Sequence, residues 1–392
     1  MVRKAAFNIL NKVIINGESL KTQDFDLNLP SADKAFLKSL VYTVFRHINR
    51  LDFIIGKLVK KRPSKELRNV LYLGICQILY LNIPLHAAIY ETVEMIKKTK
   101  YKNYSGFING VLRNYSRSPI SAENILNFPD CFTDLLKSDY SEKDLSLISS
   151  YLEKESSVDL TVKNDPDFWE KELNASINSG NNIRLKEATL IPSLKGYDSG
   201  NWWVQSYAAY LPVTLFSDLK GKNIADFCAA PGGKTLQMLS LGAKITAFDI
   251  SSKRLNILKE NLNRLHFKAE IINADPCKYQ FKKPFDAILV DAPCSGSGTL
   301  RKNPDVTLKK IDLDDLQKKQ KNLLTTAMKN VNTGGEIVYS TCSLLHCEGK
   351  TMIKNILSEF KGFSLIKEKQ VLPDNIFGEG FYMALIKRDR TE

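Results

Sequence analysis

The change of hydrophobic pattern along the chain is the feature that most restricts its fold. Over residues 1–118, apolar residues recur at helical spacing. From about residue 205, short apolar runs that suit buried strands alternate with helical stretches. Consecutive helices with short connections predict a helical bundle, whereas alternating strands and helices predict a doubly wound, mostly parallel sheet. The chain is therefore expected to be multidomain, with an all-α part followed by an α/β part.

The boundaries of the elements expected in the second part follow from this pattern. Strands are expected at residues 224–227, 244–250, 269–272, 287–290, 336–340 and 380–387. Helices are expected at residues 235–241, 252–265 and 350–360, together with a long polar helix before Gly334. A small strand–helix–strand unit is expected within residues 158–185. The predicted domains are thus a helical bundle over 1–120, a linker with a small α+β subdomain over 121–204, and an α/β domain over 205–392.

Charge and cysteine content limit the classes of protein to which the chain can belong. The net charge is +13, of which residues 1–120 carry +12 and residues 201–392 carry +8, whereas residues 121–200 carry −7. A basic block can bind a polyanion, although it can also serve solubility alone. No apolar run reaches the ~18 residues of a membrane span. The seven cysteines are odd in number and contain no Cys-x-x-Cys pair, so we expect free thiols in a reducing cytoplasm and no metal site.

The first chemical motif is the run DFCAAPGGKT at residues 226–235, placed between an expected strand and a helix. Glycines in such a loop let the backbone approach a ligand, and the helix N-terminus offers free N–H groups. The run matches neither the P-loop nor the dinucleotide-binding Gly-x-Gly-x-x-Gly pattern. The alternative interpretation is a turn that only joins a strand to a helix.

Two aspartates follow the next two expected strands. Asp249 lies about 20 residues beyond the loop, where a carboxylate can accept hydrogen bonds from both hydroxyls of a ribose. Its alternative role is to cap the following helix, for which Ser251 and Ser252 are rivals. Asp275 follows the third strand, at the same edge of the sheet. The set favours an adenosine-type ligand, and S-adenosylmethionine better than a nucleotide with a polyphosphate.

Two cysteine motifs end the fourth and fifth expected strands. DAPCSGSG begins at Asp291 and contains Cys294, and YSTCS contains Cys342. A single cysteine in a strand is usually part of the core, but two at adjacent strand ends beside a cofactor crevice favour chemistry. Metal binding is a competitor, because His346 and Cys347 lie near, although the spacing fits no standard zinc site.

A methyl-donor site with two thiols and a carboxyl group suits the methylation of a pyrimidine at C5. Attack of a thiolate on C6 converts the ring to an enamine whose C5 can accept a methyl group. A carboxyl group at N3 would stabilise the charge that develops on the ring. Loss of the C5 proton and departure of the thiolate complete the cycle.

Together, CAAPGGKT, DAPCSGSG and YSTCS resemble the motifs of the NOL1/NOP2/Sun family of RNA 5-methylcytosine methyltransferases. The resemblance implies a Rossmann-like domain in which Cys342 is the nucleophile, Cys294 assists product release and Asp291 contacts the cytosine. It also implies a set of residues that bind S-adenosylmethionine. These are Cys228, Ala229, Ala230, Pro231, Gly232, Gly233, Lys234, Asp249, Arg254, Asp275 and Asp291.

Residues 1–118 resemble the NusB-type RNA-binding domain, through IPLHAA, ETVE and GFINGVLR. A NusB-type domain joined to this methyltransferase domain is similar to bacterial enzymes that act on 16S rRNA, with an RRM-like subdomain between the two. RNA contacts are expected from two basic groups. These are Arg301 and Lys302, in a segment that resembles the family's substrate-side Arg/Lys-x-Pro-Asp, and Lys57, Lys60, Lys61 and Arg62 in the helical part.

Two positions depart from the family pattern. After Thr-Cys-Ser the family often has Pro-Glu-Glu-Asn, whereas this chain has HCEG at residues 346–349, in which only Glu348 matches. Ser206 stands where an Asp is common. These departures affect contacts near the substrate, whereas the nucleophile and cofactor motifs are intact.

The favoured interpretation is an S-adenosylmethionine-dependent methyltransferase that modifies C5 of a cytidine in 16S rRNA as a cytoplasmic monomer, with neither DNA nor a membrane as partner. One alternative is an RNA-binding assembly factor whose methylation is dispensable, and another is the same chemistry on tRNA or a different RNA. A DNA cytosine methyltransferase would use the Pro-Cys cysteine as nucleophile and leave the helical domain without a role.

Overall fold

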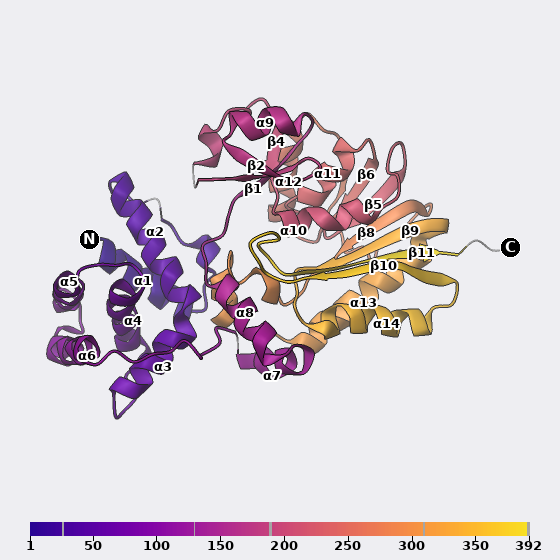
Figure 1. Cartoon of the computed structure of the whole chain (residues 1–392). Coiled ribbons are helices and arrows are strands. Elements are labelled where there is room, and N and C mark those ends of the chain that lie inside the picture. Colours follow the sequence, from indigo (N-terminus) through magenta and orange to yellow (C-terminus); the bar gives the residue numbers. More distant parts are fainter. Residues whose placement is uncertain (26, 129, 188–189, 309, 390–392) are drawn as a thin grey trace. The chain divides into compact units, whose positions relative to one another are not determined.

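The computed structural model describes residues 1–25, 27–128, 130–187, 190–308 and 310–389. The chain divides into two compact units, which Figure 1 shows coloured along the sequence. The first unit comprises Met1–Lys154 and Leu300–Lys310, and the second comprises Glu155–Thr299 and Ile311–Glu392. The predicted domain boundaries at residues 120 and 204 therefore differ from the limits of these packing units, and as domain limits they stay predictions.

The first unit is helical, as expected for residues 1–118. Its helices are α1 (Val2–Ile14), α2 (Ser31–Arg46), α3 (Ile48–Leu58), α4 (Lys65–Leu79), α5 (Leu85–Lys97), α6 (Ser105–Arg117), α7 (Asp130–Asp139) and α8 (Glu142–Leu152). Helix α4 begins after Ser64, whose side chain accepts a hydrogen bond from Leu67 N, and most of its residues are buried. Gly74 lies in α4 at a point where a Cβ would meet Leu112 of α6 at 2.7 Å, so the absence of a side chain lets the two helices pack closely.

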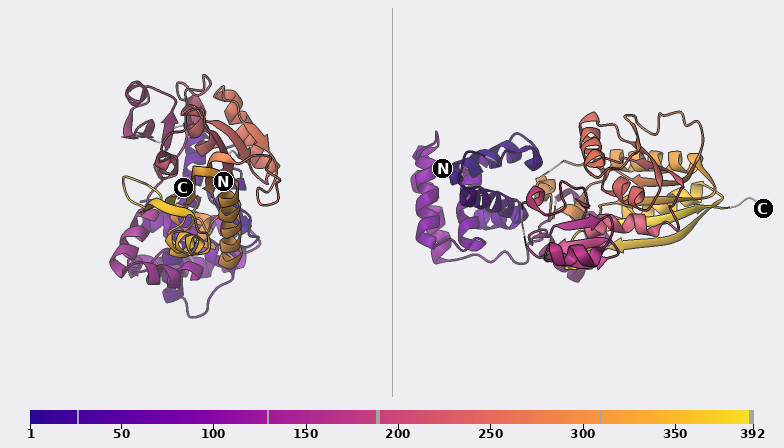
Figure 2. Two further views of the ribbon diagram at one scale, coloured as in Figure 1. Left: turned by 90° about the vertical axis from the view of Figure 1, so that its right-hand side faces the viewer. Right: turned by 90° about the horizontal axis from the view of Figure 1, so that it is seen from above.

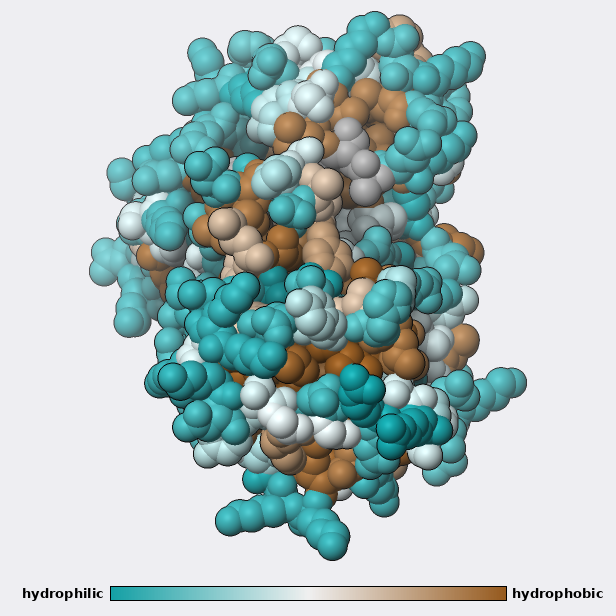
Figure 3. Space-filling view, turned by 90° about the vertical axis from the view of Figure 1, so that its left-hand side faces the viewer, coloured by the Kyte–Doolittle hydropathy of each residue, from teal (hydrophilic) through white to brown (hydrophobic). Residues whose placement is uncertain are grey.

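The face of the molecule seen in Figure 3 carries many hydrophilic residues with patches of hydrophobic residues between them. Helices α5 and α6 line a groove that combines Leu85, Tyr90 and Val93 with the basic residues Lys97 and Arg113. An exposed aromatic side chain such as Tyr90 beside basic ones suits contact with single-stranded nucleic acid.

The second unit contains a seven-stranded sheet of order β10-β11-β9-β8-β5-β6-β7. Its strands are β5 (Asn223–Phe227), β6 (Lys244–Phe248), β7 (Glu270–Ile272), β8 (Phe285–Asp291), β9 (Val331–Thr341), β10 (Phe363–Val371) and β11 (Phe381–Arg388). Strands β9, β8, β5, β6 and β7 are parallel, whereas β11 and β10 join antiparallel at one edge.

Helices cover both faces of this sheet (Figures 1 and 2). One core contains Leu236 of α11 (Gly233–Ser240) and Leu258 of α12 (Ser252–Arg264). The other contains Leu324 of α13 (Leu313–Asn330) and Ile353 of α14 (Lys350–Glu359). The expected doubly wound, mostly parallel sheet is confirmed.

The small α+β part was expected to contain a strand, a helix and a second strand. The structure adds one strand between the helix and the expected second strand, and another at the Trp202 segment. Its sheet has the order β2-β3-β1-β4 and is antiparallel where its pairings are defined. The strands are β1 (Asp159–Val162), β2 (Ala175–Ser179), β3 (Asn182–Leu185) and β4 (Trp202–Val204), and α9 (Pro166–Glu172) joins β1 to β2. Trp202 and Trp203 are both buried. Within the described part of the chain, no helix is long and apolar enough to cross a membrane.

Candidate active site

The loop of the first motif joins β5 to α11 at the carboxyl end of the sheet. Cys228 adopts a positive φ of 65°, and Gly232 adopts a φ of 113°. Glycine adopts positive φ angles far more readily than residues with a side chain. The backbone N–H of Ala230 donates to Asp249 Oδ2 over 3.2 Å, and the Arg254 guanidinium donates to the Ala230 carbonyl. The loop is therefore held in shape by two of the residues predicted to bind the cofactor.

Asp249 lies at the end of β6 and is buried. Its Oδ1 accepts from Ser251 N over 2.9 Å, while Ser251 itself caps α12 by accepting from Arg254 N. Oδ2 also pairs with Arg254 at 3.4 Å, whereas Oδ1 retains a lone pair for a ligand. Asp275 follows β7 and is partly buried, with Oδ1 accepting from Cys277 N. Both aspartates thus lie at the edge where the sequence predicted a ribose site.

Ile250 is a feature of this edge that the sequence reasoning missed. It follows Asp249 directly, and 74% of its surface is exposed. An exposed apolar side chain beside carboxylates fits a ligand that has a flat ring and hydroxyl groups. The residues present therefore fit an adenosine-containing cofactor, and the signal in the sequence was an isoleucine directly after a strand-end aspartate.

Asp226 begins the first motif at the end of β5 and is 1% exposed. Burial raises the pKa of this carboxyl group to about 7. Thr235 Oγ1 donates to Asp226 Oδ2 over 2.5 Å, and Oδ1 has no hydrogen-bond partner among the described residues. The carboxyl group thus lies beneath the cofactor loop in a setting that favours its protonated form.

The structure brings Cys294 and Cys342 together, as the two strand-end motifs predicted. Their sulfur atoms lie 3.3 Å apart, within hydrogen-bond distance for a thiol. The hydrogen bond to Cys342, together with burial, raises the pKa of Cys294 well above its usual value. Two thiols in contact at one site allow one to act as nucleophile while the other donates a hydrogen bond to it.

Asp291 lies between the cofactor loop and the cysteines. Its Oδ2 pairs with Lys234 Nζ at 2.8 Å, and its Oδ1 accepts from Ser340 Oγ over 2.8 Å. Lys234 is buried and its ammonium lies 4.9 Å from the centre of the Phe381 ring. The ion pair therefore joins the first motif to the second.

Close backbone contacts assemble the walls of the site. Gly298 N donates to the Cys342 carbonyl over 3.1 Å, and Gly380 N donates to the Gly298 carbonyl over 2.9 Å. A Cβ on Gly298 would lie 2.1 Å from the Gly380 carbonyl oxygen, so only glycine fits there. The start of β11, a strand that the sequence predicted at residues 380–387, thus borders the loop that carries Cys294.

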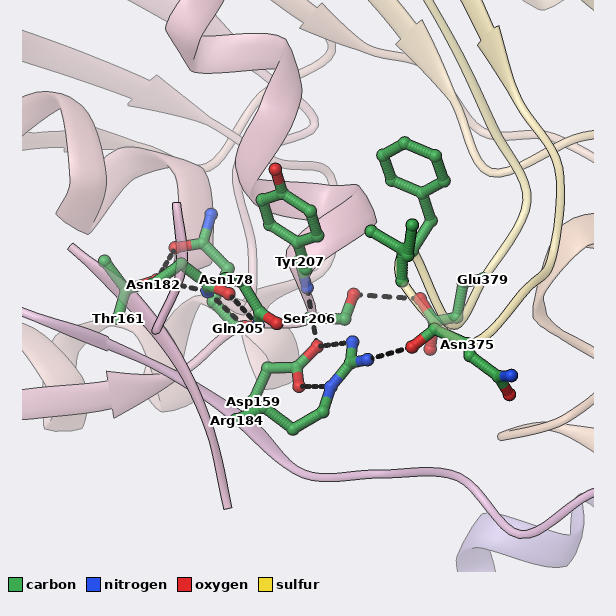
Figure 4. Close-up of polar contacts among 12 residues, drawn as sticks. Asp159, Thr161, Asn178, Asn182, Arg184, Gln205, Ser206, Tyr207, Asn375 and Glu379 are labelled. Atoms are coloured by element: carbon green, nitrogen blue, oxygen red, sulfur yellow. Dashed lines mark hydrogen bonds and ion pairs between the residues drawn. The ribbon is translucent and has the colours of Figure 1, made fainter. Parts of the chain in front are cut away.

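Ser206 forms part of a polar brace between the small sheet and the segment that precedes β11 (Figure 4). Its Oγ donates to Glu379 Oε2 over 2.9 Å. Nearby, Arg184 pairs with Asp159 at 2.6 Å and donates to the Asn375 carbonyl over 2.6 Å. A serine in place of the family's Asp therefore supplies a donor to a buried carboxylate.

The predicted RNA-contacting residues all belong to the first unit. Lys57 lies in the last turn of α3, and Lys60, Lys61 and Arg62 are exposed in the connection to α4, where Arg62 pairs with Asp52. Arg301 and Lys302 precede the short turn η6 (Pro304–Leu308), which packs on α2. In the described ranges, no group of three or more His, Cys, Asp or Glu side chains is arranged to hold a metal ion.

Comparison with known families matches both parts of the chain. Residues 213–387 match the family described as 16S rRNA methyltransferase RsmB/F, and residues 1–117 match the NusB family. Among curated proteins, the Ribosomal RNA small subunit methyltransferase B of Escherichia coli O127:H6 is 32% identical over 426 residues, covering 99% of each chain. The protein of the same name from Proteus mirabilis is 31% identical over 416 residues, covering 99% of this chain and 98% of its own.

Solved structures share the fold. The crystal structure of PH0851 has a TM-score of 0.79 at 19% identity and covers 98% of each chain. NSun6 from Pyrococcus horikoshii, solved with SFG, has a TM-score of 0.61 at 18% identity and covers 68% of this chain and 99% of its own. The fold, the site and the full-length relatives agree with the expected combination of a NusB-type domain and an S-adenosylmethionine-dependent RNA methyltransferase. The chain therefore belongs to the 16S rRNA methyltransferase RsmB/F family.

Proposed function

We propose that this methyltransferase transfers a methyl group to C5 of a cytidine in 16S rRNA through a covalent bond between Cys342 and C6. The observation that carries the proposal is the pair of thiols 3.3 Å apart, beside the Lys234–Asp291 ion pair. C5 of cytosine is a poor nucleophile, and a thiolate that adds to C6 is the group that activates it.

The cofactor would be held by the loop of the first motif and the strand-end carboxylates. The residues are Cys228, Ala229, Ala230, Pro231, Gly232, Gly233, Lys234, Asp249 and Asp275, with Arg254 fixing the loop through the Ala230 carbonyl. When bound, S-adenosylmethionine supplies the methyl group that C5 accepts.

Asp291 would bind the N3 edge of the base. Acting as an acid, the carboxyl group would donate its proton to N3 and so neutralise the negative charge that develops on the ring when the thiolate adds. Lys234 and Ser340 hold the two carboxylate oxygens, which fixes the orientation of the group. The target base must be unstacked or flipped to reach the thiols.

Cys294 would act when the product leaves. After the C5 proton is lost, the bond between C6 and sulfur breaks and its electron pair returns to Cys342 as a thiolate. The raised pKa of Cys294 keeps that group protonated, so its S–H can donate to the leaving sulfur. Hydrogen bonds to charged groups are stronger than neutral ones, which favours departure.

The test uses purified protein, 16S rRNA and labelled S-adenosylmethionine. We expect Cys342→Ala to abolish methylation, because the base is no longer activated. We expect Cys294→Ala to accumulate a covalent protein–RNA adduct, visible on a denaturing gel, because the thiolate attacks but departs slowly.

Cys277→Ala serves as the matched control: the thiol of this exposed cysteine has no role in the proposed mechanism and its backbone N–H still donates to Asp275, so both readouts should be unchanged. An adduct that persists in Cys342→Ala and disappears in Cys294→Ala would reverse the two roles. Full methylation by Cys342→Ala would reject the covalent mechanism.

A further inference from the structure

The side chain of Glu348 lies fully buried behind the two cysteine loops, with 0% of its surface exposed. Its Oε1 accepts hydrogen bonds from Ser295 N and from Gln320 Nε2, each over 2.9 Å. Its Oε2 accepts from Ser295 Oγ over 2.5 Å and from Ser343 Oγ over 2.6 Å. The carboxylate thus receives four donors, a degree of pairing that an isolated buried charge requires.

The serines that bind Glu348 come directly after the reactive cysteines. Ser295 follows Cys294 at the end of β8, and Ser343 follows Cys342 at the end of β9. The two serine hydroxyls also lie 3.3 Å from each other. One carboxylate therefore fastens both segments that carry the thiols.

The backbone of Glu348 adds a second attachment to the same region. Its carbonyl accepts from the Tyr339 hydroxyl over 2.9 Å, and Tyr339 lies in the strand that leads to Cys342. Ser297 Oγ lies 3.1 Å from Ser343 Oγ and accepts from Leu344 N over 2.9 Å, so the network continues between the loops. Both carboxylate oxygens and all three serine hydroxyls of this network are paired, and such pairing makes the local structure rigid.

We propose that Glu348 is a positioning residue that holds the Cys294 thiol in contact with the Cys342 sulfur during product release. This inference rests on the proposed function. In that step the C5 proton passes to water, its electron pair re-forms the C5–C6 double bond, and the C6–S pair goes to Cys342. Cys294 keeps its proton and donates a hydrogen bond, so its distance from the sulfur determines how well the leaving thiolate is stabilised.

The charge of Glu348 acts in the same direction as its hydrogen bonds. A negative carboxylate near Cys294 disfavours a second negative charge, and it contributes, after the hydrogen bond to Cys342 and burial, to the raised pKa of that thiol. Cys294 therefore stays a donor at neutral pH. Two variants separate these effects: Glu348→Ala removes the whole network, whereas Glu348→Gln keeps an acceptor and loses the charge.

The experiment measures adduct decay in a single turnover of the full-length protein with 16S rRNA and S-adenosylmethionine. We expect Glu348→Ala to slow decay by roughly 10- to 100-fold, as a small misplacement of reacting groups does, while affinity for RNA is unchanged. Glu348→Gln should restore much of the decay rate, because glutamine still accepts from Ser295 N and Gln320.

A second readout follows the reactivity of Cys294 by iodoacetamide labelling and mass spectrometry across a range of pH. Glu348→Gln should move its labelling profile to lower pH, since removing the negative charge makes the thiolate easier to form. A purely structural role for Glu348 would leave this profile in place.

Glu336 provides the matched control, because it is also buried on β9 and accepts from Ser217 N and Ser217 Oγ. Glu336→Ala and Glu336→Gln should alter stability without slowing adduct decay. The inference would be overturned if adduct decay were unchanged in both Glu348 variants and the labelling profile were unchanged in Glu348→Gln. Equal slowing of adduct decay by the Glu336 variants would also overturn it. Absence of any adduct in Cys294→Ala would instead reject the proposed function.

Discussion

A buried carboxyl group at the end of β5 makes the stability of the fold sensitive to pH. Asp226 has a pKa of about 7 in the folded chain because burial disfavours its charged form, whereas an unperturbed Asp has a pKa of about 4. Between these two values the folded state binds more protons than the unfolded state. The contribution of Asp226 to stability is therefore present below about pH 4, falls as pH rises and is lost above about pH 7.

Replacing Asp226 with Asn removes this dependence, because an amide does not ionise. We expect Asp226→Asn to gain stability relative to the unmodified chain on going from pH 5 to pH 8, by on the order of 1–3 kcal/mol. Urea unfolding at the two pH values measures the change. An equal difference between the two proteins at both pH values would show that Asp226 does not titrate in this range.

At the scale of residues, the sequence indicated groups that belong to continuous motifs and missed groups that meet only in space. Cys294, Cys342 and Asp291 stand in runs at strand ends, so their meeting followed from the parallel sheet. Gln320 of α13 donates to Glu348 although it lies 28 residues earlier in the chain. No spacing pattern in the sequence predicts that contact. The role of each residue in the reaction stays a prediction.

At the scale of elements, the turn from β5 into α11 depends on one glycine. Gly232 has a φ of 113°, and a Cβ at this position would lie 2.4 Å from Leu258 Cδ1 of α12. A side chain would therefore strain the backbone and push against a buried helix. The position of the loop and the packing of α12 are coupled through this contact.

We expect Gly232→Ala to lower the free energy of unfolding by about 1–3 kcal/mol and to weaken cofactor affinity, because the loop must shift. Chemical denaturation and calorimetric titration with S-adenosylmethionine measure the two effects. Gly233→Ala is the control for stability, since a Cβ there meets only Gln205 atoms at 3.6 Å or more. Equal stability of the two variants would argue against a special backbone requirement at Gly232.

The buried strands and the short edge strand β7 were predicted, whereas the exposed edge strands β10 and β2 were not. Strands β5, β6 and β8 have continuous apolar runs, because helices cover both faces of a parallel sheet. Strand β10 lies at an edge and reads FSLIKEKQV, mostly exposed, so its sequence has no strand-like pattern. Strand β2 is also an exposed edge strand and was missed for the same reason.

At the scale of the whole molecule, the segment Leu300–Lys310 packs with the helical unit although it lies between elements of the other unit. Leu300 and Val306 are buried. Asp305 is buried as well, and its Oδ2 accepts from Leu20 N over 3.2 Å. The segment that carries Arg301 and Lys302 is thus held by the helical unit. The excess positive charge of residues 1–120 favours this same unit as the part that docks RNA.

We expect Asp305→Ala to lower the stability of the helical unit by about 1–3 kcal/mol, because Leu20 N would remain buried without this acceptor. Methylation should fall even at saturating RNA, since the substrate-side segment loses its support. Urea unfolding and steady-state kinetics measure these effects, with Asp218→Ala as an exposed control that loses only a local bond to Lys220 N. A variant with normal stability and rate would separate the segment from the helices functionally.

The sequence could not reveal this arrangement. Residues 300–310 follow the DAPCSGSG motif without a break in pattern, and the contact between Asp305 and Leu20 spans 285 positions. The uneven distribution of charge along the chain was visible in the sequence, because it follows from counting charged residues. The path of the chain from one unit to the other and back was not, because it depends on packing.

This path of the chain has a consequence for recombination between relatives and for the design of hybrid proteins. The helical unit is encoded in two separate stretches of the gene, and the short one lies inside the methyltransferase part. A recombination event that replaced only residues 1–154 would pair a foreign helical surface with the resident Leu300–Lys310. Functional hybrids between relatives should therefore exchange both stretches together, and substitutions in the short stretch should accompany substitutions in α2 during divergence.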